Sequence, residues 1–236
     1  MRIDVLTLFP EMFTGVLSAS ILKRARDKKL VDYHLHQLRD YSKDPHKKVD
    51  DKPFGGGPGM VLMCQPILDA VAAIETMDAT PATRIILCPQ GRTLTQGMAE
   101  QLSKLPRLLL IAGHYEGFDE RIKQVLQPEE ISVGDYILSG GEIPAMIVID
   151  AVTRLLPGVL GDDLSNHGES FGTADATIQG GLEYPQYTKP RDYAGLSVPE
   201  ILLSGNHAAI ERWRKEQSQQ RTARKRPDLL DQEKHG

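Results

Sequence analysis

The sequence predicts an α/β fold in which a parallel sheet carries helices on both faces, followed by a small all-α C-terminal domain. Through residues 1 to 156, short continuous apolar runs alternate with helix-like segments, which is typical of a parallel sheet buried on both faces. Residues 157 to 181 contain six glycines and little apolar periodicity, which indicates a flexible linker. Residues 182 to 236 return to a helical pattern. A chain of 236 residues with 40% hydrophobic content can bury the core that this fold requires.

The predicted strands and helices alternate along the first domain. The strand-like runs are RIDVLTLF (2–9), VDYHLHQL (31–38), RIILCP (84–89) and RLLLIAG (107–113). Helices are expected over the amphipathic stretch that ends near Lys28, from Pro66 to about Met77, and from about Thr95 to Lys104. The stretches FDERIKQVL (118–126) and EEISVGDYIL (129–138) follow, ahead of a long helix that begins near Glu142.

Three loops of this domain are placed to share a pocket, because parallel sheets bind ligands beyond the carboxyl ends of their strands. They follow Leu87, Ala112 and Leu138. The third lies within SVGDYILSGGEIP (132–144), which has neither the GxxxxGK[ST] spacing of a P-loop nor the GxGxxG spacing of a dinucleotide fold. Glycine lets the backbone approach a ligand closely, so the loop suits a ligand held largely by main-chain groups. Taken alone, the same glycines are also typical of tight turns.

The last domain carries a strongly basic helix. Residues 210 to 226 hold seven Lys or Arg against two Glu, a net of +5 in a chain whose formal charge is −4. Asn206 is well placed as the N-cap of this helix, and Pro227 follows its end. A basic helix on an acidic body suggests a polyanionic partner, although a solvated helix face would explain the charges equally well.

Several classes of protein are not expected from this composition. The longest apolar run, around residues 143 to 152, is interrupted by Asp150 and is shorter than the roughly 20 residues that span a bilayer. The N-terminus MRIDVLTLFP does not resemble a signal peptide, so we expect a cytoplasmic protein with no membrane partner. The two cysteines, Cys64 and Cys88, show no metal-ligand spacing, and Cys88 is interpreted as a small buried residue rather than a nucleophile.

Six ordered blocks of the sequence resemble the TrmD family of bacterial tRNA (guanine-N1)-methyltransferases, and the resemblance covers nearly the whole chain. They are DDKPFGGGPGM (50–60), LCPQGR (87–92), AGHYEGFDER (112–121), SVGDYILSGGE (132–142), YPQYTKP (184–190) and LLSGNHAAIERWR (202–214). The resemblance implies a SPOUT-type fold with a deep trefoil knot in the C-terminal part of the sheet domain. Periodicity alone would not have predicted a knot, since knotted chains are rare.

The resemblance also implies that S-adenosylmethionine binds in the pocket formed by the three loops. Tyr136 and Leu138 would offer apolar surface to the nucleoside. Glu116 would lie near the methionine end, where its negative charge would either face the sulfonium or help to hold Mg²⁺. The expected cofactor-binding residues are Leu87, Gly113, Tyr115, Glu116, Val133, Gly134, Asp135, Tyr136, Ile137, Leu138, Gly140 and Gly141.

The implied reaction is methylation of N1 of the guanosine immediately 3′ of the anticodon. This nitrogen carries an amide-like proton, so a general base is required, and Arg154 matches the family position of a guanidinium that stabilises charge on O6. Family members commonly have Asp-Ser-Phe in the linker, whereas this chain has Glu-Ser-Phe at 169–171 and a longer stretch before Gly180. Glu169 is therefore predicted to be the base, with Asp175 as its rival. His167 is interpreted as a solvated loop histidine.

The resemblance further implies a tRNA anticodon stem-loop as partner, no DNA, and a homodimer whose active site is shared between the subunits. The linker would order over bound RNA. Mg²⁺ is associated with the family, but the sequence shows no spacing of ligands that places a metal site. The residues expected to bind RNA are His46, Lys48, Gly59, Met60, Asn206, Arg212, Arg214 and Arg221.

Two other functions remain compatible with the residues. One is an RNA-binding module that has kept the fold and lost catalysis, for which the Glu169 replacement and the altered linker are the only support. The other is a methyltransferase of the same fold that acts on ribosomal RNA. The full-length resemblance and the particular C-terminal domain argue against both.

Overall fold

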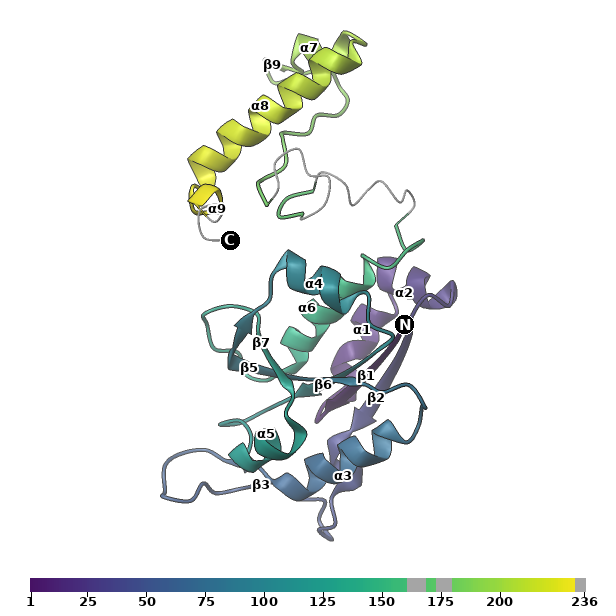
Figure 1. Cartoon of the computed structure of the whole chain (residues 1–236), viewed down its shortest axis with the longest axis vertical. Helices are drawn as coiled ribbons and strands as arrows, with labels where there is room; N and C mark the ends of the chain where they lie inside the picture. The colour runs from purple at the N-terminus through teal and green to yellow at the C-terminus, as the bar shows by residue number, and fades with distance from the viewer. Residues whose placement is uncertain (161–168, 173–179, 232–236) are drawn as a thin grey trace. The chain divides into compact units, whose positions relative to one another are not determined.

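The computed structural model describes residues 1–160, 169–172 and 180–231, and the chain forms two compact units, Met1–Gly161 and Asp162–Gly236 (Figure 1). The division falls inside the stretch predicted as a linker. His167 and Asp175 lie outside the described residues. Within the described ranges, no helix is long and apolar enough to cross a membrane.

A five-stranded parallel sheet forms the centre of the first unit, as the alternation of strands and helices predicted. Its strand order is β2-β1-β6-β5-β7. The strands are β1 (Arg2–Thr7), β2 (Asp32–Gln37), β5 (Thr83–Thr93), β6 (Arg107–Ala112) and β7 (Glu129–Ser132). Neighbouring strands of this sheet pair in parallel, so their carboxyl ends meet at one edge. A separate antiparallel pair joins β3 (Asp50–Asp51) to β4 (Val61–Leu62).

The sheet is buried on both faces. Successive side chains of a strand point to opposite faces, and in these strands both sets are apolar. In β6, Leu108 and Leu110 belong to one hydrophobic cluster, whereas Leu109 and Ile111 belong to the other. The helices cover both faces (Figure 1). The first cluster is covered by α1 (Thr14–Leu17), α2 (Ser20–Asp27), α4 (Gln96–Leu102) and α6 (Glu142–Thr153), and the second by α3 (Cys64–Glu75) and α5 (Glu120–Leu126).

Two of these helices begin at side-chain caps. Thr95 accepts a hydrogen bond from the backbone N–H of Met98 at the start of α4, and Asp119 accepts one from the N–H of Arg121 at the start of α5. Such caps satisfy backbone donors that have no partner within the helix. The predicted helix starts near Thr95 and Glu142 are confirmed, while α3 begins at Cys64, two residues before the predicted start.

The stretch EEISVGDYIL is strand only in its first four residues. β7 ends at Ser132, and the following residues form a loop. Next to it, β5 changes register between Leu87 and Arg92, and a Cβ on Gly91 would lie 2.4 Å from backbone atoms of β7. Most apolar residues of this stretch therefore lie in the loop beyond the carboxyl end of β7, and only Ile131 lies in the sheet.

The second unit is built around one long helix, α8 (His207–Lys225), preceded by α7 (Glu200–Leu203) and followed by α9 (Asp228–Asp231). Asn206 caps α8 by accepting a hydrogen bond of 3.1 Å from the N–H of Ala209, as predicted. The prediction of an all-helical domain was wrong in one place, because β8 (Asp192–Tyr193) and β9 (Leu196–Ser197) form an antiparallel hairpin. Its two turn residues, Ala194 and Gly195, both have positive φ, and Ala-Gly is not a strong sequence signal for such a turn.

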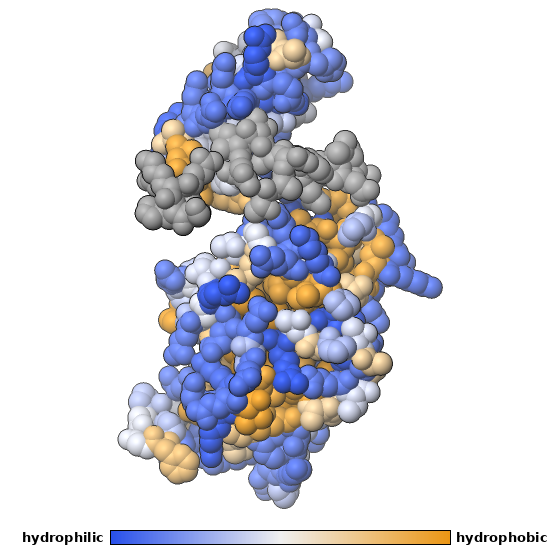
Figure 2. Space-filling view, viewed as in Figure 1, coloured by the Kyte–Doolittle hydropathy of each residue, from blue (hydrophilic) through white to orange (hydrophobic). Residues whose placement is uncertain are grey.

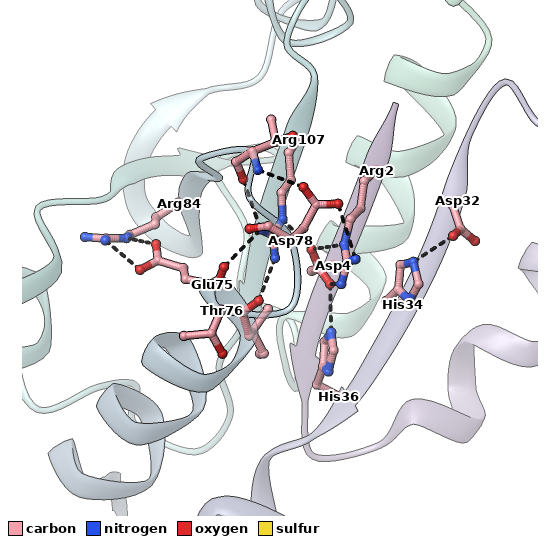
Figure 3. A network of polar contacts seen from close by, with 12 residues as sticks. Arg2, Asp4, Asp32, His34, His36, Glu75, Thr76, Asp78, Arg84 and Arg107 are labelled. Carbon is pink, nitrogen blue, oxygen red and sulfur yellow. Dashed lines mark hydrogen bonds and ion pairs between the residues drawn. The ribbon is translucent and has the colours of Figure 1, made fainter.

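A buried ion-pair network closes the amino edge of the sheet (Figure 3). The carboxylate of Asp4 is fully buried and accepts hydrogen bonds from Arg2, His36 and Arg107 at 2.8–2.9 Å. Arg107 is 1% exposed and also donates to four backbone carbonyls at and after the end of α3. One guanidinium therefore joins β1, β6 and the loop after α3.

Burial alone would raise the pKa of Asp4, but the hydrogen bonds from His36, Arg2 and Arg107 outweigh it and hold this pKa well below its usual range. Because the pKa is lowered by folding, the ionised network contributes stability above about pH 4 and loses it as the pH falls further.

We expect the Asp4→Asn substitution to lower the free energy of unfolding by about 3–5 kcal/mol at pH 7, since it leaves a buried guanidinium without its charged partner. Urea denaturation between pH 3 and pH 7 would measure this, with the loss of stability toward acid pH smaller in the variant. Asp27→Asn, which removes an exposed ion pair with Lys23, is the control and should leave the midpoint nearly unchanged. Equal midpoints for Asp4→Asn and the control would contradict a stabilising role for the network.

Candidate functional site

A cavity of about 240 Å³ opens at the carboxyl edge of the sheet, between the irregular part of β5 that begins at Leu87 and the loops that follow β6 and β7. This is the edge at which ligands bind in parallel α/β folds. Its walls are formed by Leu87, Cys88, Pro89, Gly113, His114, Tyr115, Glu116, Gly117, Phe118, Ile131, Ser132, Val133, Gly134, Tyr136, Ile137, Leu138, Ser139, Gly140, Gly141 and Pro144.

The structure brings together the residues that the sequence predicted as cofactor-binding. All of them line this cavity except Asp135, which is not part of its wall. Their role toward a cofactor stays a prediction. What the geometry adds is that segments up to 57 residues apart in the chain, from Leu87 to Pro144, form one concave surface.

The wall depends on close contacts between backbones. The N–H of Gly141 donates a hydrogen bond of 2.7 Å to the carbonyl of Gly113. A Cβ on Gly141 would lie 2.7 Å from Cα of Ala112 and from N of Gly113, closer than real Cβ atoms approach. At Gly134, φ is +148°, and a Cβ would meet the Tyr136 ring at 2.4 Å. Glycine is required at Gly141 by space and at Gly134 by both space and backbone conformation.

Exposed aromatic and aliphatic side chains project from the same loops. Tyr115, Tyr136 and Ile137 are all exposed large side chains. Tyr115 has a φ of +59°, which is rare for a side chain of this size, and the Tyr136 hydroxyl donates to the carbonyl of Val133 at 3.0 Å. A rigid, partly apolar wall with main-chain donors and acceptors is suited to a nucleoside.

Sequence reasoning missed several wall residues, among them His114, Phe118, Pro89 and Cys88. Most of them lie next to predicted residues within the same motifs, so these motifs could have identified them. Cys88 was expected to be buried but is only partly so; desolvation and the neighbouring Glu130 raise the pKa of its thiol. The thiol donates to Oε2 of Glu130 at 3.1 Å, and Lys123 pairs with the same oxygen at 2.8 Å.

The glycine loop between β3 and β4 is anchored at the cavity wall. The N–H of Glu116 donates to the carbonyl of Met60 at 2.9 Å, and a Cβ on Gly59 would lie 2.3 Å from the Glu116 carboxylate. Both loop residues were predicted to bind RNA, and they lie beside a predicted cofactor residue. His46 is exposed, and Lys48 pairs with Asp51 at 3.0 Å.

The two residues predicted to be catalytic lie in different units. Arg154 is the C-cap of α6, at the end of the helix opposite the cavity. Glu169 precedes a turn in which the N–H of Gly172 donates to the Glu169 carbonyl at 3.3 Å. The structure does not place either side chain in the wall of the cavity.

The basic residues of α8 differ in their exposure and in their contacts with other residues. Arg212 is exposed. Arg214 stacks over the Tyr184 ring at 4.9 Å and pairs with Glu211, and Arg221 donates to the carbonyl of Glu183 at 3.2 Å.

A second, polar hollow of about 420 Å³ lies along this helix, between Arg221, Arg224, two glutamines and Tyr187. Arg224 was not singled out from the sequence. In the space-filling view the surface around α8 is mostly hydrophilic (Figure 2).

No group of three or more His, Cys, Asp or Glu side chains that could hold a metal ion occurs within the described ranges. The expectation of Mg²⁺ therefore has no site assigned to it.

The sequence is similar to known proteins over almost its entire length. The family model described as tRNA (Guanine-1)-methyltransferase TrmD matches residues 1–232. Curated relatives named tRNA (guanine-N(1)-)-methyltransferase include those of Ruminiclostridium cellulolyticum, 57% identical over 98% of this chain and 96% of the relative. Those of Geobacillus kaustophilus and Halalkalibacterium halodurans are 56% and 54% identical over 98% of this chain and 92% of each relative.

We expect Gly141→Ala to disrupt the cavity, because the added methyl group would meet backbone atoms that cannot rotate away. Equilibrium dialysis with S-adenosylmethionine should show binding to the wild type and little or none to the variant. Gly15→Ala is the matched control, since its methyl group would enter open space. Binding by Gly141→Ala at the wild-type level would show that the tight passage is not needed for the pocket.

Proposed function

The chain belongs to the TrmD family of tRNA (guanine-1)-methyltransferases, and we propose that it transfers the methyl group of S-adenosylmethionine to N1 of the guanosine immediately 3′ of the anticodon. The observation that carries the proposal is the cavity at the carboxyl edge of the sheet, whose wall unites nearly all residues expected to contact the cofactor. Since tRNA is the substrate, we place the enzyme in the cytoplasm.

The residues of the cavity fit S-adenosylmethionine by the nature of their atoms. Backbone groups of Leu87, Gly113 and the 133–138 loop can bond the adenine and ribose, and Tyr136 and Leu138 offer apolar surface. When bound, this compound supplies a methyl group activated by a sulfonium. Glu116 can face that positive charge from the neighbouring wall. The chain's own contribution is to hold and orient the donor.

The proposal includes the deep trefoil knot of the SPOUT fold. Two crossings support it, one where Gly91 meets β7 and one where Gly141 meets the end of β6. At both, one segment passes another so closely that no side chain fits between them.

The guanine N1–H must lose its proton as N1 attacks the methyl carbon and the carbon–sulfur bond breaks. We propose that the carboxylate of Glu169 accepts this proton. The Arg154 guanidinium would stabilise the negative charge that develops on O6. The turn that follows Glu169 is bonded to the region before α8, by the N–H of Phe171 to the carbonyl of Gly181 at 2.8 Å and the N–H of Glu183 to the hydroxyl of Ser170 at 3.0 Å. This anchored position supports the assignment of Glu169 as the base.

The geometry of α6 supports a homodimer with shared sites. Its 12 residues extend about 18 Å, so Arg154 lies far from the cavity at which α6 begins. Arg154 can then serve the cavity of a second subunit. An apolar face near the cavity is suited to that contact, because Met12, Val16, Ile143 and Ile147 are all 39–49% exposed and Met12 and Ile143 line the same hollow.

The tRNA anticodon stem-loop would contact both units. The basic face of α8 neutralises phosphates, and the 55–60 loop approaches the target base beside the cavity. The target guanine leaves its stack to reach the methyl donor, as in other enzymes that modify bases.

Methyl transfer from radiolabelled S-adenosylmethionine to tRNA transcripts tests the proposed function. Transcripts with guanosine 3′ of the anticodon should be labelled, and transcripts with adenosine at that position should not. Binding of the cofactor without any incorporation would favour an RNA-binding protein that has lost catalysis.

Glu169→Gln should lower kcat by about 10²–10⁴-fold with cofactor binding retained, because an amide cannot accept the N1 proton. Single-turnover methylation at saturating tRNA would measure the chemical step. Asp175→Asn is the comparison, and it should keep a rate close to that of the wild type. If Asp175→Asn were the inactive variant instead, the base would be Asp175.

Arg224→Gln should weaken tRNA binding and reduce the slope of log affinity against log salt by about 1, because one phosphate contact is lost. Filter binding between 50 and 300 mM salt would measure both. Lys23→Gln removes an exposed cation from α2, in the other unit, and should leave the slope unchanged. An unchanged slope for Arg224→Gln would show that the hollow along α8 does not contact RNA phosphates.

A further inference from the structure

A buried carboxylate lies directly behind the wall of the cavity. Glu142 is the first residue of α6 and is 1% exposed. Its Oε1 accepts a hydrogen bond of 2.7 Å from the hydroxyl of Thr7, and its Oε2 lies 3.1 Å from Nε2 of His114. Because a buried carboxylate is costly without partners, both oxygens must be satisfied for this arrangement to persist.

The carboxylate connects three segments that are distant in the sequence. Thr7 ends β1 and is fully buried, His114 follows β6, and Glu142 begins α6. The Thr7 hydroxyl also accepts a hydrogen bond of 3.0 Å from the N–H of Phe9, so its proton is directed to Glu142. One carboxylate oxygen thus accepts from the hydroxyl, and the other lies against the imidazole.

The contact between Glu142 and His114 determines where the wall can lie. A Cβ on Gly140 would be 2.2 Å from Nε2 of His114 and 2.5 Å from Oε2 of Glu142, so the backbone of Gly140 lies directly on this pair. An isolated β-bridge also joins His114 to Gly140. The His114 ring packs edge-on against Phe9 at 5.0 Å and Tyr115 at 5.7 Å.

We infer that Glu142 is a positioning residue for the methyl donor, acting through His114. The pair holds Gly140 and Tyr115 in the positions that shape the cofactor pocket, without contact between Glu142 and the reacting atoms. The inference rests on the proposed function and adds to it a residue that was not among the expected site residues. Its consequence is specific: loss of the contact should weaken cofactor binding and leave both tRNA affinity and the chemical step nearly intact.

Glu142→Gln tests the inference with a side chain of the same shape. A carboxamide replaces one of the two carboxylate oxygens by an NH₂ group, so it cannot accept at the Thr7 position and at the His114 position together. We expect the Kd for S-adenosylmethionine, measured by isothermal titration calorimetry, and its KM to rise about tenfold or more, as for loss of a hydrogen bond to a charged group. The kcat and the Kd for tRNA should stay within about twofold of the wild type. Glu120→Gln, on the exposed start of α5, is the matched control.

A second pair of variants covers the case in which Glu142→Gln fails to fold. His114→Gln keeps an N–H that can donate to Glu142, whereas His114→Leu does not. Cofactor affinity should be close to wild type in the first and reduced about tenfold in the second. Equal affinities in the wild type and His114→Leu, or equal losses in both His114 variants, would overturn the inference.

The outcomes also separate this inference from the proposed function. If the wild type binds no S-adenosylmethionine, the proposed function fails. If the wild type binds it and methylates tRNA while Glu142→Gln folds and binds it equally well, only the positioning role fails.

Discussion

The close passage of Gly141 across the end of β6 is the constraint on which the carboxyl edge of the sheet depends. With a hydrogen bond of 2.7 Å to Gly113 and no room for a Cβ, it fixes the start of α6 against the loop after β6. Glu142 follows immediately and is thereby brought to Thr7 and His114. The glycine-rich wall of the cavity and the buried carboxylate behind it therefore both adjoin this backbone contact.

The two edges of the sheet are stabilised in different ways. At the amino edge, Asp4 and Arg107 form a buried ionic network that also holds the end of α3. At the carboxyl edge, backbone contacts and short loops leave a concave surface with exposed side chains such as Tyr136 and Ile137. The charged network holds the amino edge together, whereas close backbone contacts such as that of Gly141 with Gly113 and the buried Glu142–His114 pair hold the loops of the carboxyl edge.

The sequence was a good guide where side-chain pattern determines structure. The parallel sheet, the start of α6 and the Asn206 cap all follow from local periodicity and capping chemistry. It was a poor guide where backbone geometry or long-range pairing decides. The end of β7 at Ser132 and the β8–β9 hairpin depend on turns that their residues signal weakly.

The candidate site divides in the same way. Its glycines could be predicted because they recur within motifs at the carboxyl ends of strands. The roles of Glu142 and Arg107 could not, since each depends on partners more than 25 residues away in the chain. A charged residue within a helical or strand pattern is normally expected at the surface, so its burial becomes evident only when the fold supplies its partners.

The proposed base, Glu169, and the basic helix α8 belong to the same structural unit, so contacts made by the helix affect the segment that carries the base. Leu182, next to the turn that follows Glu169, donates its N–H to the hydroxyl of Thr222 on α8 at 2.9 Å. The Arg226 guanidinium near the end of the same helix lies over the Phe171 ring at 5.7 Å. Contacts of RNA with α8 would therefore fix the segment that carries Glu169. Under the proposed function, recognition of the RNA by α8 and removal of the proton by Glu169 would therefore depend on the same set of contacts.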